Sequence, residues 1–409
     1  MKKTKKQIFV VGLGCGQKRL LTRQASAILA RAELVLAGER EIPYLEGLTG
    51  EHCEIRAAED PREIRAAIME SKAGDIAVCL PGEAGESPLF EELVRSLSDL
   101  RPSAVPGVSV MSLLSSRTGV SYRDARFVEI GEKPVNLADL LTGNSKLFLS
   151  GTGNVRPLFQ DLIRAGMGGA VVYAGEHLGL LGEGVSRGTV SEMAERSFSG
   201  DAVFFLVRTE RREACRFGIR DSLLKTASVE GLPSAVRAVI ASRTGVVPGD
   251  TVYVIGDGNG ACAAEAALAS ESGTVYSIYL TAECAGCALD NAAALGIRNL
   301  KVIQGTGPAA LGPLDEPDAV IVADDRAADT DLLQILMSRN PNVRMVFAMR
   351  TFEKVSLVLS FMEARNMNPE LIEIRSGSGT GLRSAHYIKS DAPFWILSGL
   401  RSSDAAFDG

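Results

Sequence analysis

Two glycine-rich stretches decide how this chain folds: Ile8-Phe-Val-Val-Gly-Leu-Gly-Cys-Gly16 and Thr251-Val-Tyr-Val-Ile-Gly-Asp-Gly-Asn-Gly260. In each stretch an apolar, β-prone run ends in alternating glycines and is followed by a helix-like segment. Glycine lets a backbone approach a ligand closely, because it has no Cβ and adopts positive φ without strain. Open α/β sheets bind ligands at the carboxyl ends of their strands. The two stretches therefore predict two nucleotide-type sites in a fusion protein.

Length and composition narrow the class of protein. At 409 residues the chain exceeds one ordinary hydrophobic core, so two domains are expected. It is 46% hydrophobic and 23% charged, as soluble globular proteins are. A net charge of −6 argues against nucleic-acid binding. Apolar runs such as Ala319–Ala323 are far shorter than the roughly 20 residues of a membrane span.

The cysteines and the basic start Met1–Lys6 bear on the compartment. Met1–Lys6 runs straight into the first predicted strand without an apolar segment, which favours a solvated tail over a signal peptide. The seven cysteines are then expected to be reduced thiols. We expect a cytoplasmic protein that forms a homo-oligomer.

The first half alternates strand and helix signals in two groups. Strands are predicted at 8–12, 34–37, 76–80, 146–150, 170–174 and 202–207, helices at about 22–33 and 88–98, and a turn from Pro102 to Pro106. We expect a module over 1–210, with subdomains at about 1–115 and 116–210 and a cleft between them. The charged stretch 208–220 is the best candidate for a linker.

The second half, 221–409, is a more regular βαβ series. Strands are predicted at 251–255, 274–278, 300–303, 318–322, 343–348, 369–374 and 393–398, and helices at 261–269 and 285–295. This order predicts a doubly wound, Rossmann-like sheet.

The second glycine loop points to a particular cofactor. Its glycines fall at every second position over 256–260, unlike the dinucleotide pattern G-x-G-x-x-G. The tighter form is typical of Rossmann-like enzymes that use S-adenosylmethionine (SAM), which carries no pyrophosphate; a plain tight turn is the alternative. Such enzymes usually end the next strand with an acidic ribose ligand, where this chain has Tyr279. A phenol can hydrogen-bond once or stack on adenine, but it does not replace a bidentate carboxylate. We therefore expect the first module to bind SAM more tightly than the second.

Beyond these loops, a series of short motifs runs through both halves. They are Val10-Val-Gly-Leu-Gly14, Leu20-Leu-Thr22, Ala32–Arg40, Val105-Pro-Gly-Val-Ser109, Glu176-His-Leu-Gly179, Gly188-Thr-Val-Ser-Glu192, Phe217-Gly-Ile-Arg-Asp221, Ala235-Val-Arg-Ala238 and Asn291–Leu300. In order and spacing, over about 8–400, the chain resembles the fused precorrin-6Y C5,15-methyltransferases (decarboxylating) of cobalamin biosynthesis. In that family a tetrapyrrole-methylase module precedes a Rossmann-like methyltransferase.

The resemblance implies SAM-dependent methylation of a tetrapyrrole at two meso carbons, with decarboxylation of an acetate side chain. SAM contacts are then expected at Gly12, Gly14, Gly82, Glu83, Pro106, Gly107, Val108, Ser109, Gly151, Thr152, Glu176 and His177 in the first module, and at Gly256, Asp257, Gly258, Gly260, Tyr279 and Thr306 in the second. Because the substrate carries many carboxylates, Lys133 and Arg237 are candidate substrate-binding residues. No catalytic residue is assigned and no metal is expected.

Several polar positions depart from the family pattern, so a catalytically impaired tetrapyrrole- or SAM-binding paralogue is the alternative function. The family's glycine-rich segment after the fourth strand of the second module is replaced by Ala323-Asp-Asp325, followed by Arg326. This cluster is expected to meet substrate, to bind a divalent ion, or to be a solvated loop. Cys284-Ala-Gly-Cys287 is a lone C-x-x-C, for which helix packing is favoured over zinc.

Overall fold

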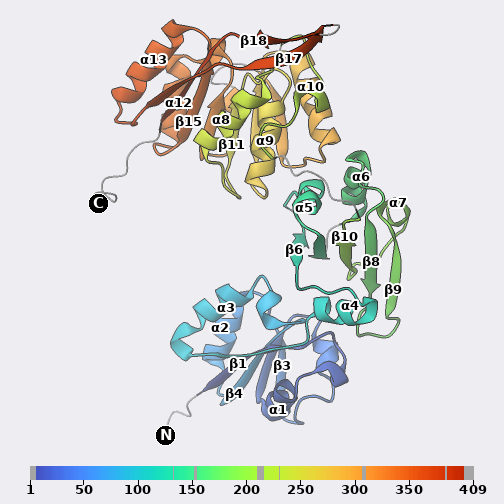
Figure 1. Cartoon of the computed structure of the whole chain (residues 1–409). Helices are drawn as coiled ribbons and strands as arrows, with labels where there is room; N and C mark the ends of the chain where they lie inside the picture. Colours follow the sequence, from blue (N-terminus) through green and yellow to red (C-terminus); the bar gives the residue numbers. More distant parts are fainter. Residues whose placement is uncertain are drawn as a thin grey trace, which may run out of the picture.

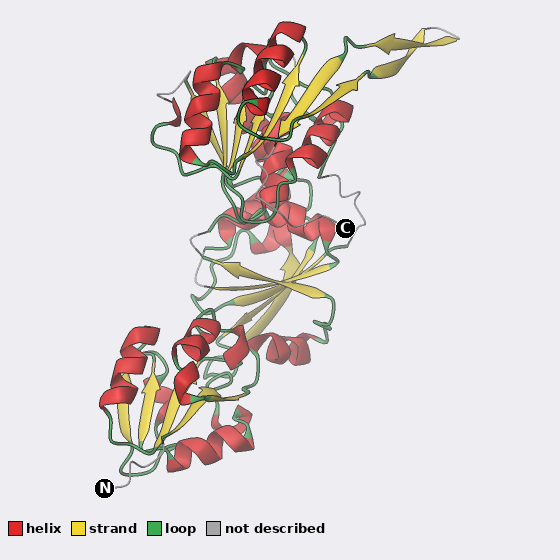
Figure 2. Ribbon diagram, turned by 90° about the vertical axis from the view of Figure 1, so that its left-hand side faces the viewer, coloured by secondary structure: helices red, strands yellow, loops and turns green. Residues whose placement is uncertain are grey.

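The computed structural model describes residues 6–131, 133–151, 154–209, 216–229, 231–305, 310–382 and 385–399. Three main sheets follow one another along the chain, each with its own helices (Figure 1). Each sheet together with its helices is called a layer below. Viewed from the side, the first, second and third layers lie in a row, and the second contacts both of the others (Figure 2). None of the helices in the described part of the chain has the length and apolarity needed to cross a lipid bilayer.

The first sheet is parallel and has the order β3-β2-β4-β1-β5. Its elements are β1 (Gln7–Gly12), α1 (Arg23–Arg31), β2 (Leu34–Ala37), β3 (Glu54–Ala57), α2 (Pro61–Glu70), β4 (Asp75–Leu80), α3 (Phe90–Ser96) and β5 (Ser103–Val105). The interior strand β1 buries Val10 and Val11 completely, because helices cover both faces of the sheet. The turn predicted from Pro102 to Pro106 is wrong: its middle residues pair with β1 as β5.

The second sheet is mixed and has the order β6-β7-β10-β8-β9. Its elements are α4 (Val110–Thr118), β6 (Ala125–Ile130), α5 (Leu137–Gly143), β7 (Lys146–Gly151), α6 (Arg156–Arg164), β8 (Val171–Glu176), β9 (Gly184–Thr189), α7 (Val190–Met193) and β10 (Val203–Val207). Leu113 and Leu114 of α4 pack against Phe148 and Phe205 of this sheet, so α4 joins the first layer to the second.

The third sheet has the order β13-β12-β11-β14-β15-β19-β16. Its elements are α8 (Ser234–Thr244), β11 (Val252–Ile255), α9 (Ala261–Ser270), β12 (Val275–Tyr279), α10 (Ala282–Ala294), β13 (Leu300–Gln304), β14 (Ala319–Val322), α12 (Thr330–Arg339), β15 (Arg344–Met349), α13 (Phe352–Glu363), β16 (Glu370–Ile374) and β19 (Phe394–Gly399). The five strands from β13 to β15 are parallel, and β19 and β16 extend the sheet antiparallel. The predicted doubly wound α/β class is confirmed.

A hairpin of β17 (Gly377–Leu382) and β18 (Ala385–Ser390) forms a separate two-stranded sheet beside the third layer (Figure 1). The sequence does not predict it, because its glycines and polar residues lack the apolar alternation of a half-buried strand.

Candidate active sites

The third sheet has a cavity at the carboxyl ends of its central strands. Its volume is about 220 Å³. The lining residues follow four parallel strands and the start of α12: Ile255, Gly256, Ile278, Leu280, Gly305, Leu311, Asp324, Arg326, Ala327, Asp329 and Leu332. Strand order reverses at β11, with β12 on one side and β14 on the other. The cavity thus lies where doubly wound sheets bind their ligands.

The glycine loop after β11 forms one wall of this cavity. Gly256, Gly258 and Gly260 all have positive φ, at 79°, 51° and 81°. A Cβ on Gly256 would lie 2.5 Å from Asp324 Cβ, so only glycine lets the β14 turn come this close. The predicted residues Gly256, Gly258 and Gly260 therefore form one turn, and Gly256 lines the cavity.

Asp257 lies within the loop but points into the protein. It is 1% exposed; its Oδ2 accepts a hydrogen bond from the Ala263 backbone N–H at 2.8 Å, and its Oδ1 is buried without a partner. Burial raises the pKa of this carboxyl from 3.8 to about 7. The sequence predicts that Asp257 contacts a cofactor. In the structure its carboxylate points into the protein and supports the start of α9 instead.

Two further predicted residues of the second module are buried. Tyr279 is 1% exposed and its hydroxyl oxygen accepts a hydrogen bond from Ser277 at 2.7 Å, so its ring is packed inside the protein and does not line the cavity. Arg237 is 0% exposed and pairs with Glu265 at 2.8 Å and with Asp221 at 2.6 Å. Because Arg237 is fully buried and both of its partners belong to the same domain, this geometry favours a structural role over substrate binding. Thr306 lies outside the described residues.

In the first module the predicted glycines pack against each other. Gly14 and Gly82 exchange backbone hydrogen bonds of 3.0 Å. A Cβ on Gly12 would lie 2.6 Å from the Gly107 nitrogen, and one on Gly107 would lie 2.1 Å from the Gly82 carbonyl oxygen. The loops after β1, β4 and β5 thus touch through their backbones, and Gly12 and Gly107 are glycines because of that contact. Gly82 itself faces open space.

Glu83 connects two of these loops. Its Oε2 accepts the Gly107 N–H at 2.8 Å and its Oε1 accepts the Gly85 N–H at 3.4 Å. Pro106, Val108 and Ser109 share the same junction: the Pro106 carbonyl accepts from Thr22 Oγ1, the Val108 carbonyl from Cys15 Sγ, and Ser109 caps α4. The structure therefore brings the predicted residues of the first subdomain together.

The predicted residues of the second subdomain are bound to their own layer. Gly151 approaches Ile130, the Glu176 Oε1 accepts the Ser199 N–H at 2.9 Å, and His177 Nδ1 lies 3.1 Å from Asp201 Oδ2. The glycine of the same segment, Gly179, reaches the first layer, where it lies against Cys15. Thr152 lies outside the described residues. Within the described ranges, no group of three or more His, Cys, Asp or Glu side chains is arranged to hold a metal ion.

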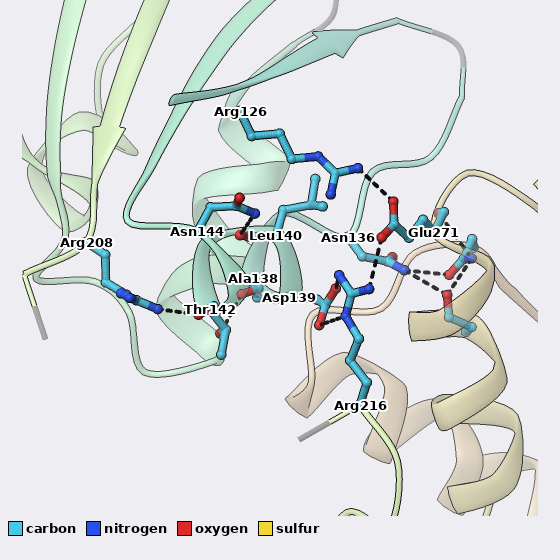
Figure 3. A network of polar contacts seen from close by, with 12 residues as sticks. Arg126, Asn136, Ala138, Asp139, Leu140, Thr142, Asn144, Arg208, Arg216 and Glu271 are labelled. Atoms are coloured by element: carbon cyan, nitrogen blue, oxygen red, sulfur yellow. Dashed lines mark hydrogen bonds and ion pairs between the residues drawn. The ribbon is translucent and has the colours of Figure 1, made fainter. Parts of the chain in front are cut away.

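Lys133 lies at a different place, in a hollow between the second and third layers. This hollow of about 500 Å³ is lined by Arg126, Phe127, Lys133, Glu271 and their neighbours. Glu271 binds Arg126 at 2.7 Å and Arg216 at 3.0 Å, and Arg216 also binds Asp139 at 2.8 Å (Figure 3). The sequence did not reveal this network, because its charges are scattered singly along the chain.

A second contact between the second and third layers is buried and is made by asparagine side chains. It shows which edge of the third sheet faces the second layer. Asn136 Nδ2 donates to Asn299 Oδ1 at 2.8 Å, and Asn136 Oδ1 accepts the Arg298 N–H. Asn299 directly precedes β13, and Glu271 lies in the short turn between α9 and β12, so both lie at the amino ends of the strands. A five-residue strand spans about 15 Å. The third layer therefore docks through the edge opposite its cavity.

Comparison with known proteins agrees with this architecture. Residues 7–194 match the family of tetrapyrrole (corrin/porphyrin) methylases, and residues 233–395 match the precorrin methyltransferase domain. The two halves thus match two methyltransferase families, one after the other.

A similar protein carries both domains. The precorrin-6Y C(5,15)-methyltransferase [decarboxylating] of Sinorhizobium sp is 26% identical over 79% of this chain and 79% of its own. This is the family that the sequence motifs resemble, and the similarity extends over most of the chain.

Single-domain proteins match parts of the chain. A probable cobalt-precorrin-6B C(15)-methyltransferase (decarboxylating) of Methanobrevibacter smithii is 26% identical over 43% of this chain and 94% of its own. The crystal structure of a precorrin-6Y C5,15-methyltransferase from Geobacter metallireducens has a TM-score of 0.43 and 19% identity, covering 46% of this chain and 98% of that one.

Proposed function

We propose that this enzyme transfers methyl groups from SAM to meso carbons of a precorrin-type tetrapyrrole and removes the carboxyl group of an acetate side chain. The two-domain relative named above supports both the substrate and the decarboxylation. The structural observation that carries the proposal is the cavity at the carboxyl ends of β11, β12, β13 and β14, where the strand order reverses.

The residues around this cavity fit SAM. Ile255, Ile278, Leu280, Leu311 and Leu332 offer an apolar surface to the neutral adenine, whereas Asp324 and Arg326 are charged. SAM supplies an activated methyl group when bound. Methyl transfer needs an in-line approach in a dry, oriented site, so positioning by these residues is the main contribution. The electron-rich tetrapyrrole supplies its own carbon nucleophile, so methyl transfer depends less on a general base than hydrolysis does.

We also propose a SAM site in the first module. The three glycine-bearing loops and Glu83 lie together beside the second subdomain, where the resemblance expects a second SAM. Their backbones already touch, so we propose weaker SAM binding here than in the third layer. This reverses the expectation drawn from Tyr279 alone.

We further propose that the protein forms a homo-oligomer and is cytoplasmic. A two-stranded hairpin is marginally stable alone, and β18 exposes Tyr387 at 50% and Ile388 at 75%. These two features support a homo-oligomer, which light scattering would test. Composition supports a cytoplasmic enzyme.

Mass spectrometry tests the proposed reaction. Precorrin-6Y is incubated with SAM and the full chain, and the masses of the products are measured. We expect a gain of two methyl groups together with loss of carbon dioxide. Unchanged substrate, with SAM binding intact by calorimetry, would instead favour the impaired paralogue.

A further inference from the structure

The turn after β14 carries two opposite charges that line the cavity of the third sheet. Arg326 Nε lies 3.0 Å from Asp324 Oδ1 and 2.9 Å from Oδ2, and Arg326 Nη2 lies 2.5 Å from Oδ2. The Asp324 side chain is 20% exposed and that of Arg326 is 65% exposed. The acid thus lies deep in the cavity wall and the guanidinium lies towards solvent.

This pair is fixed in place from both sides. Asp324 Cβ packs beside Gly256, so the acid is held against the glycine loop. Asp324 Oδ1 also accepts the Arg326 backbone N–H at 2.9 Å, which closes the turn. Burial alone would raise the pKa of Asp324, but hydrogen bonds from Arg326 outweigh it and lower the pKa, so the carboxylate is ionised.

The neighbouring acids have other partners. Asp325 accepts the Arg350 and Thr351 N–H groups at 2.9 Å and 3.0 Å, which ties this turn to the end of β15. Asp329 accepts the Leu332 N–H at 2.8 Å and caps α12. Arg326 bonds Asp324 through Nε and Nη2, and among the described residues Nη1 has no hydrogen-bond partner, so the guanidinium has donors left for a carboxylate.

We propose that Asp324 and Arg326 bind the zwitterionic amino-acid tail of the methyl donor, with Asp324 taking the α-ammonium group and Arg326 the α-carboxylate. The inference rests on the proposed function and assigns the orientation of SAM in its site. Adenine and ribose are uncharged, so the tail is the part of SAM that matches two opposite charges on one short turn. The apolar lining residues of the cavity are then left for the adenine.

Three ligands separate the tail from the rest of the molecule. The full chain is titrated by calorimetry with SAM, with S-adenosylhomocysteine and with 5′-methylthioadenosine, which lacks the amino-acid tail. For Asp324→Asn and for Arg326→Gln we expect SAM and S-adenosylhomocysteine to bind about tenfold to a hundredfold more weakly, because each change removes a charge-assisted hydrogen bond. The affinity for 5′-methylthioadenosine should stay within about twofold.

Glu373 and Arg375 provide the matched control. They form an acid–arginine pair with the same two-residue spacing, at 2.7 Å, where β16 ends. The double variant Glu373→Gln/Arg375→Gln should leave all three affinities unchanged. Equal weakening of all three ligands in the Asp324 and Arg326 variants, or no weakening, overturns the inference. If the wild-type chain binds none of the three, the proposed function falls with it. Because Arg326 is largely exposed, its variant is expected to fold even if Asp324→Asn does not.

Discussion

The two glycine-rich strand ends look alike in sequence and differ in what their glycines do. After β1, Gly12 and Gly107 let three loops touch through their backbones. After β11, Gly256 lets the β14 turn approach while a cavity stays open beside it. A glycine pattern thus indicates close approach of a backbone, but the partner is another loop in one case and a ligand-sized cavity in the other. Their acidic residues differ as well, since Glu83 has backbone donors for both carboxylate oxygens and Asp257 for only one.

The largest expected effect concerns Asp257. Its carboxyl has a pKa of about 7 in the folded chain against 3.8 for the ordinary group. Below about pH 4 it is protonated in both states; as the pH rises towards 7 only the unfolded state loses the proton, so the free energy of unfolding falls, by about 4 kcal/mol in all.

Asp257→Asn should remove this dependence. Urea unfolding at pH 5 and pH 8 would show the variant gaining stability relative to wild type at the higher pH. Parallel pH profiles for the two proteins would show that the buried oxygen is compensated in another way.

The loops of the first module give the next largest effect. Gly107→Ala would place a Cβ 2.1 Å from the Gly82 carbonyl oxygen, and backbone cannot move as a side chain can. We expect a loss of about 3 kcal/mol in the free energy of unfolding. Gly85→Ala, whose Cβ would meet only Glu83 Oε1 at 3.9 Å, is the control and should change it by less than about 0.5 kcal/mol. Similar values for both variants would contradict the closed-loop account.

A smaller effect is expected from cutting the chain between its modules. Limited proteolysis should cleave first within 208–222, the boundary region that contains the predicted linker 208–220. The ion pairs of Glu271 and the amide contacts of Asn136 should then hold the two fragments together, so they should elute as one species in gel filtration at low salt. Separate elution, or first cleavage inside 76–110 or 251–325, would argue against this layout.

Local patterns in the sequence predicted the parallel strands and the doubly wound third sheet, because buried strands leave continuous apolar runs. They did not predict β5, whose flanking prolines are typical of a turn, or the hairpin of β17 and β18. For the sites, the glycines after β11 were found from spacing, but the direction of a side chain is set by tertiary packing. Tyr279 and Arg237 were therefore assigned to ligands although both are buried among internal partners. The charged cluster that contains Asp324 and Arg326 is visible in the sequence, but only the folded structure shows that these two residues line a cavity.

The central claim is that the carboxyl edge of the third sheet holds SAM more tightly than the loops of the first module. Ultraviolet cross-linking tests it directly: the full chain is irradiated with methyl-labelled SAM, digested, and the labelled peptides are identified. At SAM concentrations that label a minority of molecules, the label should lie in peptides from 255–280 or 305–332. Label found mainly in peptides from 12–16 or 82–109 would contradict the account.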